Sequence, residues 1–239
     1  MKRSLGAKPL GLPAPVWVVG SYSPDGSPAI MVVSWGGICC STPPCVAISI
    51  DKTRFSHANI IEHRAFTVNV PSRRHLIATD YLGLVSGATV DKFSATGLTA
   101  VKSDTVQAPF VKEFPLVFEC RLLQSIDIGS HTQFIGQIMD VKADEAVLDD
   151  RGNPVAGKVS PLISSAGDRS YYALGEYLEQ AYVPGMALMA EIAAKNGTNE
   201  PEPGALAPGE AAPTGTGRRA DLQRAGRKSH HEKEMTYAT

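Results

Sequence analysis

The segment around Arg54 is the clearest candidate for binding chemistry. Arg54 and Ser56 stand where a helix is expected to begin, with Ser56 as its N-cap. A positive charge and a hydroxyl at a helix N-terminus favour an anion such as phosphate. Asn59 in the first turn can add amide hydrogen bonds, and Lys92 can complete the anion site from another segment. The alternatives are a surface ion pair between Arg54 and Asp51, and simple helix capping by Ser56.

Metal and nucleophilic chemistry have weaker support. Cys39, Cys40 and Cys45 are close in sequence, and His57 and His63 follow them. Metal sites usually use tighter Cys-x-x-Cys pairs, so we interpret the cysteines as strand thiols and expect no metal site. No Rossmann fingerprint, P-loop or Gly-x-Ser-x-Gly motif occurs. The sequence therefore predicts neither a Rossmann nucleotide site nor a serine triad.

The elements that must position these residues are mostly strands. Runs of β-branched, aromatic or alternating apolar residues, bounded by proline and glycine turns, predict strands over residues 16–22, 29–35, 45–50, 66–70, 116–128 and 131–141. Apolar residues at helical spacing predict helices over residues 56–64, 73–84 and 171–182. Many short strands, few helices and no regular strand–helix alternation predict a mainly β fold, an antiparallel barrel with peripheral helices.

The composition changes abruptly near Ala194. Residues 195–234 contain no Val, Ile, Phe, Tyr or Trp, but several prolines and a basic cluster. Such a stretch cannot bury enough apolar surface to offset the entropy of ordering it. We therefore expect a folded domain over residues 1–194 and a disordered C-terminal tail over residues 195–239, with an interaction tail as the alternative.

Overall composition excludes several classes of protein. The 239 residues carry 23 Lys and Arg against 24 Asp and Glu, a net charge of −1, which argues against a nucleic-acid partner. No apolar run approaches the ~18 residues of a membrane helix, and no secretory signal is expected. Four cysteines do not make a disulfide scaffold. A cytoplasmic protein with reduced thiols and no membrane partner is the expectation.

Five segments, taken in order, resemble the flavin reductase-like family of FMN-binding split barrels, particularly its flavoredoxin-type members. They are residues 29–37, the Ser-Thr-Pro-Pro loop at 41–44 with its following strand, residues 51–60, Asp91-Lys92-Phe93, and Gly129-Ser130-His131 through Gly136. The resemblance covers about residues 8–182. It implies an antiparallel Greek-key split β-barrel.

The resemblance also implies FMN as the cofactor. The residues expected to hold FMN are Met31, Val32, Val33, Ser34, Cys40, Ser41 and Ser49 beside the ring, and Arg54, Ser56, Asn59 and Lys92 around the phosphate. His131 is the candidate catalytic residue, because the matching histidine of the family lies where nicotinamide docks. Ser130 stands where the family usually has Asp, so the carboxylate beside His131 is missing.

An FMN-binding oxidoreductase is the function that the resemblance implies. Electrons would pass from NAD(P)H through bound FMN to a flavin, a metal complex or a redox partner protein, in a homodimer with FMN between the subunits. The alternative is a flavoredoxin-type FMN electron carrier that a partner protein reduces and nicotinamide does not. The missing Asp beside His131 favours this alternative slightly. A third hypothesis, from another class, is an interaction protein that uses its tail.

Overall fold

The computed structural model describes residues 1–196 of the chain. Residues 1–177 form one compact unit, and the described residues 178–196 belong to a second unit. In that second unit the described element is α5 (Val183–Asn196). The predicted tail over residues 195–239 lies outside the described residues, except for its first two positions.

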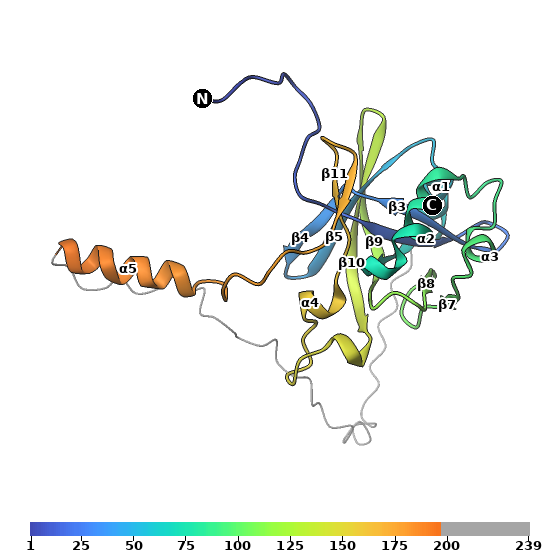
Figure 1. Ribbon diagram of the computed structural model, residues 1–239. Coiled ribbons are helices and arrows are strands. Elements are labelled where there is room, and N and C mark those ends of the chain that lie inside the picture. Colours follow the sequence, from blue (N-terminus) through green and yellow to red (C-terminus); the bar gives the residue numbers. More distant parts are fainter. Residues whose placement is uncertain (197–239) are drawn as a thin grey trace, which may run out of the picture. The chain divides into compact units, whose positions relative to one another are not determined.

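A seven-stranded antiparallel sheet dominates the first unit (Figure 1). Its strands, in sheet order, are β3 (Pro28–Val33), β2 (Trp17–Tyr22), β6 (Ala65–Val70), β9 (Leu116–Ile128), β10 (His131–Ala143), β5 (Pro44–Asp51) and β4 (Gly36–Ser41). The smaller sheets are β1 (Ala14–Pro15), β11 (Ile163–Ser165) and β12 (Ser170–Tyr172), and the pair β7 (Ala100–Lys102) and β8 (Pro109–Val111). The predicted mainly β, antiparallel fold is confirmed.

Short helices surround the sheet. They are α1 (Phe55–His63), the 3-10 turn Arg73–His75, α2 (Leu76–Leu84), α3 (Lys92–Thr96), the 3-10 turn Glu145–Val147 and α4 (Ala156–Val159). Leu82 of α2 and Phe93 of α3 pack with Val18 and Ile30 of the sheet in one apolar cluster. This packing holds both helices beside β3. Within residues 1–196, no helix is long and apolar enough to span a membrane.

The main core lies inside the curled sheet. Phe66 of β6 and Phe134 of β10 are fully buried there, together with aliphatic residues of β2 and β5. Gly136 makes this packing possible, because a Cβ at its position would lie 2.4 Å from Cζ of Phe66 and 3.0 Å from Cβ of Cys120. Close packing of this kind leaves no room for an added methyl group.

The two ends of the sheet order approach each other beside β3. The linker Ser34–Trp35 leads from β3, at one end of the order, to β4, at the other end. The Ser49 N–H of β5 donates to the Trp35 carbonyl at 2.8 Å. This hydrogen bond fixes the end of β3 against the end of β5.

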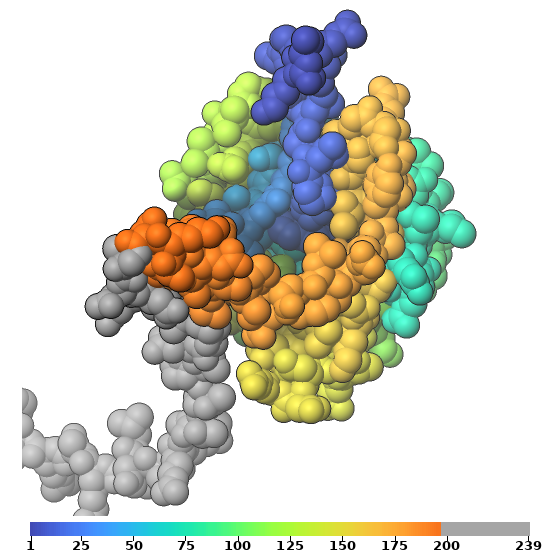
Figure 2. All heavy atoms as spheres, turned by 60° about the vertical axis from the view of Figure 1, so that its left-hand side comes forward, coloured from blue at the N-terminus to red at the C-terminus, as the bar shows by residue number. Residues whose placement is uncertain are grey.

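The predicted helix over residues 171–182 is wrong. Tyr171 and Tyr172 belong to β12, and the next helix begins at Val183. The start of this segment is extended because it pairs with β11 and because Tyr171 Oη donates to Asp80 at 2.9 Å. The spacing of apolar residues carries no information about either of these tertiary contacts. In Figure 2 the N-terminal segment, in blue, runs beside the segment that carries β11, to which β1 is paired.

Two other boundaries differ from the sequence prediction. Residues 36–41, where no strand was predicted, form β4, because they pair with β5. The expected helix over residues 73–84 divides into a 3-10 turn and α2. The long hairpin of β9 and β10 begins where it was predicted, since its alternating pattern is strong.

Changing Gly136 to Ala should destabilise the protein, because the new Cβ collides with Phe66. Overpacking of a tight core typically costs about 1–3 kcal/mol of unfolding free energy. Urea unfolding followed by circular dichroism measures the change. Gly37→Ala is the matched control, since nothing lies within 4 Å of a Cβ at that strand position. Equal stabilities of the two variants would contradict the packing described here.

Candidate functional site

A groove runs along β3 where the sheet ends meet. Its first part, which we call the strand hollow, has a volume of about 240 Å³. It is lined by Met31, Val32, Val33, Ser34, Trp35, Ser49, Ile50, Asp51, Arg54 and His131. The strand hollow therefore brings together residues from β3, β5, the start of α1 and the start of β10.

The groove continues into a smaller space beside the start of α1. This cation hollow, of about 150 Å³, shares Met31, Val32 and Arg54 with the strand hollow. Phe55 and Ser56 of α1 line it, as do residues of the loop after α2 and Lys92 of α3. Two basic side chains from different segments thus line one small space.

Arg54 is the first of these two cations. It is the N-cap residue of α1, with extended backbone, so its side chain lies at the positive end of the helix dipole. Within residues 1–196, no carboxylate lies within 4 Å of its guanidinium. Asp51, considered as its ion-pair partner, accepts hydrogen bonds from the Thr53 N–H (2.9 Å) and hydroxyl (2.6 Å) instead. These bonds lower the pKa of Asp51.

Lys92 is the second cation, and it is buried. Only 6% of the residue is exposed, and Nζ donates to the Leu82 carbonyl at 2.7 Å. Burial, aided by the charge of Arg54, lowers the pKa of Lys92 to about 8. A buried ammonium beside a second cation lacks charge compensation, so an anion in the cation hollow would stabilise both.

Ser56 lines the cation hollow but does not cap the helix. The structure places the N-cap two residues earlier than predicted, at Arg54, with no side-chain capping bond. Ser56 is the second helical residue and is 3% exposed. Because the helix begins earlier, Ser56 presents its hydroxyl from the first turn, where backbone N–H groups are also available.

Three predicted binding residues lie away from the groove. Asn59 is buried on another side of α1, where its Nδ2 donates to Ser21 Oγ at 3.3 Å. Cys40 and Ser41 stand at the far end of β4, paired with Cys45 and Pro44, whereas the strand hollow contacts β5 at Ser49 and beyond. In residues 1–177 the groove does not contain them. The other predicted binding residues and His131 line it.

His131 stands at the edge of the strand hollow with its ring held on two sides. The Trp35 ring centroid lies 4.8 Å from that of His131, with an interplanar angle of 34°. Ser130 Oγ is hydrogen-bonded to His131 Nδ1 at 2.8 Å. Ser130, at the position where the resemblance implies Asp, therefore orients the imidazole without a negative charge.

A polar network supports the turn before His131. His57 Nε2 is hydrogen-bonded to Thr132 Oγ1 at 2.8 Å, and this hydroxyl donates to Asp127 at 2.7 Å. Lys52 lies 3.4 Å from the same carboxylate. Burial lowers the pKa of His57, which favours its neutral form. The network links α1 to both strands of the β9–β10 hairpin.

Sequence reasoning missed several residues of the groove. Trp35, Phe55 and Asp51 line it but were not selected as binding residues. Trp35 could have been selected, because an aromatic residue at the end of a strand often lines a binding site. The loop after α2 carried no signal at all. Within the described part of the chain, no group of three or more His, Cys, Asp or Glu side chains is arranged to hold a metal ion.

A family model described as "Flavin reductase like domain" matches residues 10–167. Among solved structures, flavoredoxin of Desulfovibrio vulgaris (Miyazaki F) is 47% identical, with a TM-score of 0.74, over 77% of this chain and 100% of that chain. Flavoredoxin from Methanosarcina acetivorans is 28% identical, with a TM-score of 0.74, over 79% of this chain and 100% of that chain. An FMN-binding protein from Thermus thermophilus is 25% identical, with a TM-score of 0.64, over 75% of this chain and 98% of that chain.

The lowered pKa of Lys92 predicts a pH-dependent stability. Between the folded value of about 8 and the ordinary value of 10.5, the unfolded chain holds more protons at this residue. The Lys92 contribution to the unfolding free energy should therefore rise with pH in this window, by roughly 1 kcal/mol per pH unit. Urea unfolding of wild type and Lys92→Met from pH 7.5 to 10 measures the difference. The exposed Lys102→Met is the control, and parallel curves for wild type and Lys92→Met would contradict the burial of this charge.

Proposed function

Because the chain belongs to the flavin reductase-like family, we propose that it is an FMN-binding oxidoreductase. It would pass electrons from NAD(P)H through bound FMN to a flavin, a metal complex or a redox partner protein. The observation that carries the proposal is the cation hollow, which adjoins the strand hollow and is lined by Arg54 and the buried Lys92. Within residues 1–196, neither cation forms an ion pair with a carboxylate.

The cation hollow suits the FMN phosphate. Arg54 offers a charged fork of donors, Ser56 offers a hydroxyl, and α1 offers the positive end of its dipole. Phosphate binding would also restore the pKa of Lys92 towards its ordinary value, because the anion compensates the ammonium. Groups from two elements, the start of α1 and Lys92 of α3, would thus contribute to one anion site.

The strand hollow suits the flavin ring. Met31, Val32 and Val33 provide apolar side chains and strand-end backbone groups, while Ser34 and Ser49 add hydroxyl groups. Bound FMN supplies the electron chemistry, and the protein supplies position and electrostatics. No side-chain nucleophile is needed for such a reaction.

His131 is the proposed catalytic residue. With Nδ1 bound to Ser130 and the ring packed on Trp35, its Nε2 is the nitrogen left for a substrate. Nε2 could then hold the nicotinamide side of an electron donor in the strand hollow. Its orientation is fixed by Trp35 and by the hydroxyl of Ser130.

The second candidate is a flavoredoxin-type electron carrier, reduced by a partner protein and not by nicotinamide. Two observations favour it: Ser130 in place of the usual Asp, and the 47% identity to a flavoredoxin. Both candidates require the same FMN site. They differ only in the electron donor.

We also propose that the protein works as a homodimer. Trp35 and Ile128, which flank His131, are 45% and 57% exposed, and Ile38 of β4 is 61% exposed. Exposed apolar side chains beside a site commonly mark an interface. A second subunit on this face would cover the open edge of the strand hollow.

The proposed compartment is the cytoplasm. All four cysteines are free, with Cys39 and Cys40 exposed and Cys45 and Cys120 buried. Two exposed thiols on one hairpin would oxidise in an oxidising compartment and persist in a reducing one.

Changing Arg54 to Ala should weaken FMN binding and leave riboflavin binding unchanged, because riboflavin lacks the phosphate. Loss of a charge-assisted hydrogen bond costs about 1.5–3 kcal/mol, or roughly 10- to 150-fold in Kd. Fluorescence titration of the apoprotein with both flavins measures the preference. Arg73→Ala, at an exposed arginine outside the groove, is the control. Equal losses for both flavins would reject Arg54 as the phosphate anchor.

Stopped-flow reduction of the FMN-loaded protein separates the two candidates. An NAD(P)H oxidoreductase should be reduced by NADH or NADPH, and His131→Ala should slow this at least about tenfold with FMN affinity unchanged. Ser130→Ala should give an intermediate loss, because the ring keeps its packing on Trp35. Absence of reduction by either nucleotide, with rapid reduction by dithionite, would select the carrier.

Light scattering should show a dimer in solution. Ile38→Glu should weaken the dimer, because it places a charge in the proposed interface. Ile77→Glu is the matched control, since Ile77 is 87% exposed on α2, away from this face. A wild-type monomer with FMN bound would contradict the dimer.

A further inference from the structure

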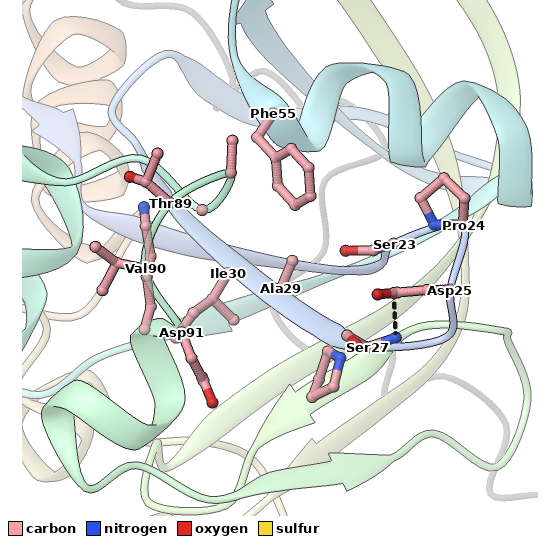
Figure 3. A pocket seen from close by; sticks show the side chains of 14 residues that line it. Ser23, Pro24, Asp25, Ser27, Ala29, Ile30, Phe55, Thr89, Val90 and Asp91 are labelled. Carbon is pink, nitrogen blue, oxygen red and sulfur yellow. Dashed lines mark hydrogen bonds between the residues drawn. The ribbon is translucent and has the colours of Figure 1, made fainter.

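Three of the four cysteines gather at the turn end of the β4–β5 hairpin. Cys39 and Cys40 are exposed, whereas Cys45 is only 2% exposed. In the described part of the chain, none of them lines the groove, nor the cleft of about 580 Å³ between the turn after β2 and the loop before α3 (Figure 3). The chemistry of these thiols is therefore separate from the proposed flavin site.

Cys40 and Cys45 stand directly opposite each other in this hairpin. Cys40 of β4 is the register partner of Cys45 of β5, and the two strands are antiparallel. Opposed residues of antiparallel strands have Cα atoms about 4.5–5.5 Å apart, which lies within the range of about 4.4–6.8 Å that disulfides span. Their side chains also share one face of the hairpin. The backbone therefore already holds this pair at the spacing of a disulfide bond.

The other cysteine pairs lack this geometry. Cys39 and Cys40 are neighbours in the chain, so their Cα atoms are about 3.8 Å apart, which is shorter than disulfides usually span. Cys39 also lies in the register shift between Ile38 and Cys40 and has no paired residue on β5. Cys120 belongs to β9, and because β10 lies between β9 and β5, two strand spacings of about 4.8 Å separate it from Cys45. The pair whose register fits is Cys40 and Cys45.

Strand β4 can make the small movement that a bond requires, and a reagent can reach it. In the described sheet β4 is the last strand of the order, and the bulge in its middle bends it locally. Cys40 is exposed, and its Sγ donates to the Thr42 carbonyl at 3.4 Å. Ile38, in the proposed dimer interface, pairs with Val46, so it lies on the opposite face of the hairpin from Cys45 and its partner. A second subunit on Ile38 therefore leaves the face of Cys40 open.

The two thiols would have different roles in forming a bond. Burial, with the nearby thiols of Cys39 and Cys40, raises the pKa of Cys45, and burial also shields Cys45 from reagents. Cys40 is exposed, so it meets an oxidant first. Cys45 is then the resolving thiol, because it is held opposite Cys40.

We propose that Cys40 and Cys45 form a redox-modification site that reacts with low-molecular-weight disulfides such as oxidised glutathione. The Cys40 thiolate attacks one sulfur of the small disulfide, whose S–S bond breaks and releases one thiol. Cys45 then loses its proton and attacks Cys40 Sγ, which releases the second thiol and leaves a Cys40–Cys45 disulfide. The two cysteines lose two electrons and two protons, and the small disulfide gains them as it becomes two thiols.

The bond would fix the edge strand β4 to β5 across the Ser-Thr-Pro-Pro turn. In the reducing compartment proposed above, the pair stays as two thiols, and the disulfide forms when small disulfides accumulate. The site does not depend on the proposed flavin function, because none of its residues contacts the groove.

Treatment of the full chain with oxidised glutathione tests the site. After alkylation of the free thiols, tandem mass spectrometry of a digest should locate a bond between Cys40 and Cys45 in wild type, with no glutathione retained on Cys40. Cys45→Ala should instead keep glutathione on Cys40, because the resolving thiol is missing. Cys39→Ser is the matched control on the neighbouring exposed cysteine, and should form the same bond at a rate within about twofold of wild type.

Several results would overturn the site. These are a wild type whose Cys40 and Cys45 stay free at millimolar oxidised glutathione, a glutathione adduct that persists on Cys40 in wild type, and a bond that maps to Cys39 or joins two copies of the chain. If Cys45→Ala does not fold, the exposed Cys40→Ser decides, since it should leave Cys45 unmodified. FMN titration of the same samples is a separate measurement, and failure to bind FMN would reject the proposed function but not the thiol site.

Discussion

The hydrogen bond from the Ser49 N–H to the Trp35 carbonyl joins the two ends of the sheet, and the groove depends on it. The two-residue linker Ser34–Trp35 keeps the ends of β3 and β4 together, and this hydrogen bond extends the β4–β5 pairing up to the end of β3. His131 is paired with Asp51 of β5 and comes to the groove with it. The meeting of β3 and β5 thus brings together side chains, such as Met31 and His131, that are about a hundred residues apart in sequence.

Electrostatics set the second constraint. Lys92 is buried among apolar residues beside Arg54, which costs folding free energy while no anion compensates the charges. Such a cost is typical of binding sites, where a residue is placed for its ligand and the rest of the fold supplies the stability. Here the tightly packed interior around Phe66 and Phe134 supplies it. The buried charge of Lys92 therefore lies outside the apolar core that supplies most of the stability.

The sequence predicted what local pattern determines and missed what tertiary contacts determine. The alternation in residues 116–128 located β9, and the predicted residues Arg54, Ser56 and Lys92 do line one hollow. Cys40 and Ser41 lie outside the groove because residues 36–41 pair as a strand, and register is not readable from composition. Asn59 lies outside the groove because its side chain is buried and bonded to Ser21 of β2. Phe55 carried no signal, since an apolar residue at a helix start usually belongs to a core.

The position of Trp35 gives the protein a built-in optical reporter. The chain has two tryptophans, and they occupy different surroundings. Trp17 is partly buried and packs against the cores, whereas Trp35 is 45% exposed and lines the strand hollow against His131. An aromatic ligand entering that hollow contacts Trp35 and leaves Trp17 in its packed environment. Intrinsic emission of the unmodified chain therefore separates occupancy of the groove from unfolding of the sheet, with Trp35→Phe as the variant that removes only the first signal.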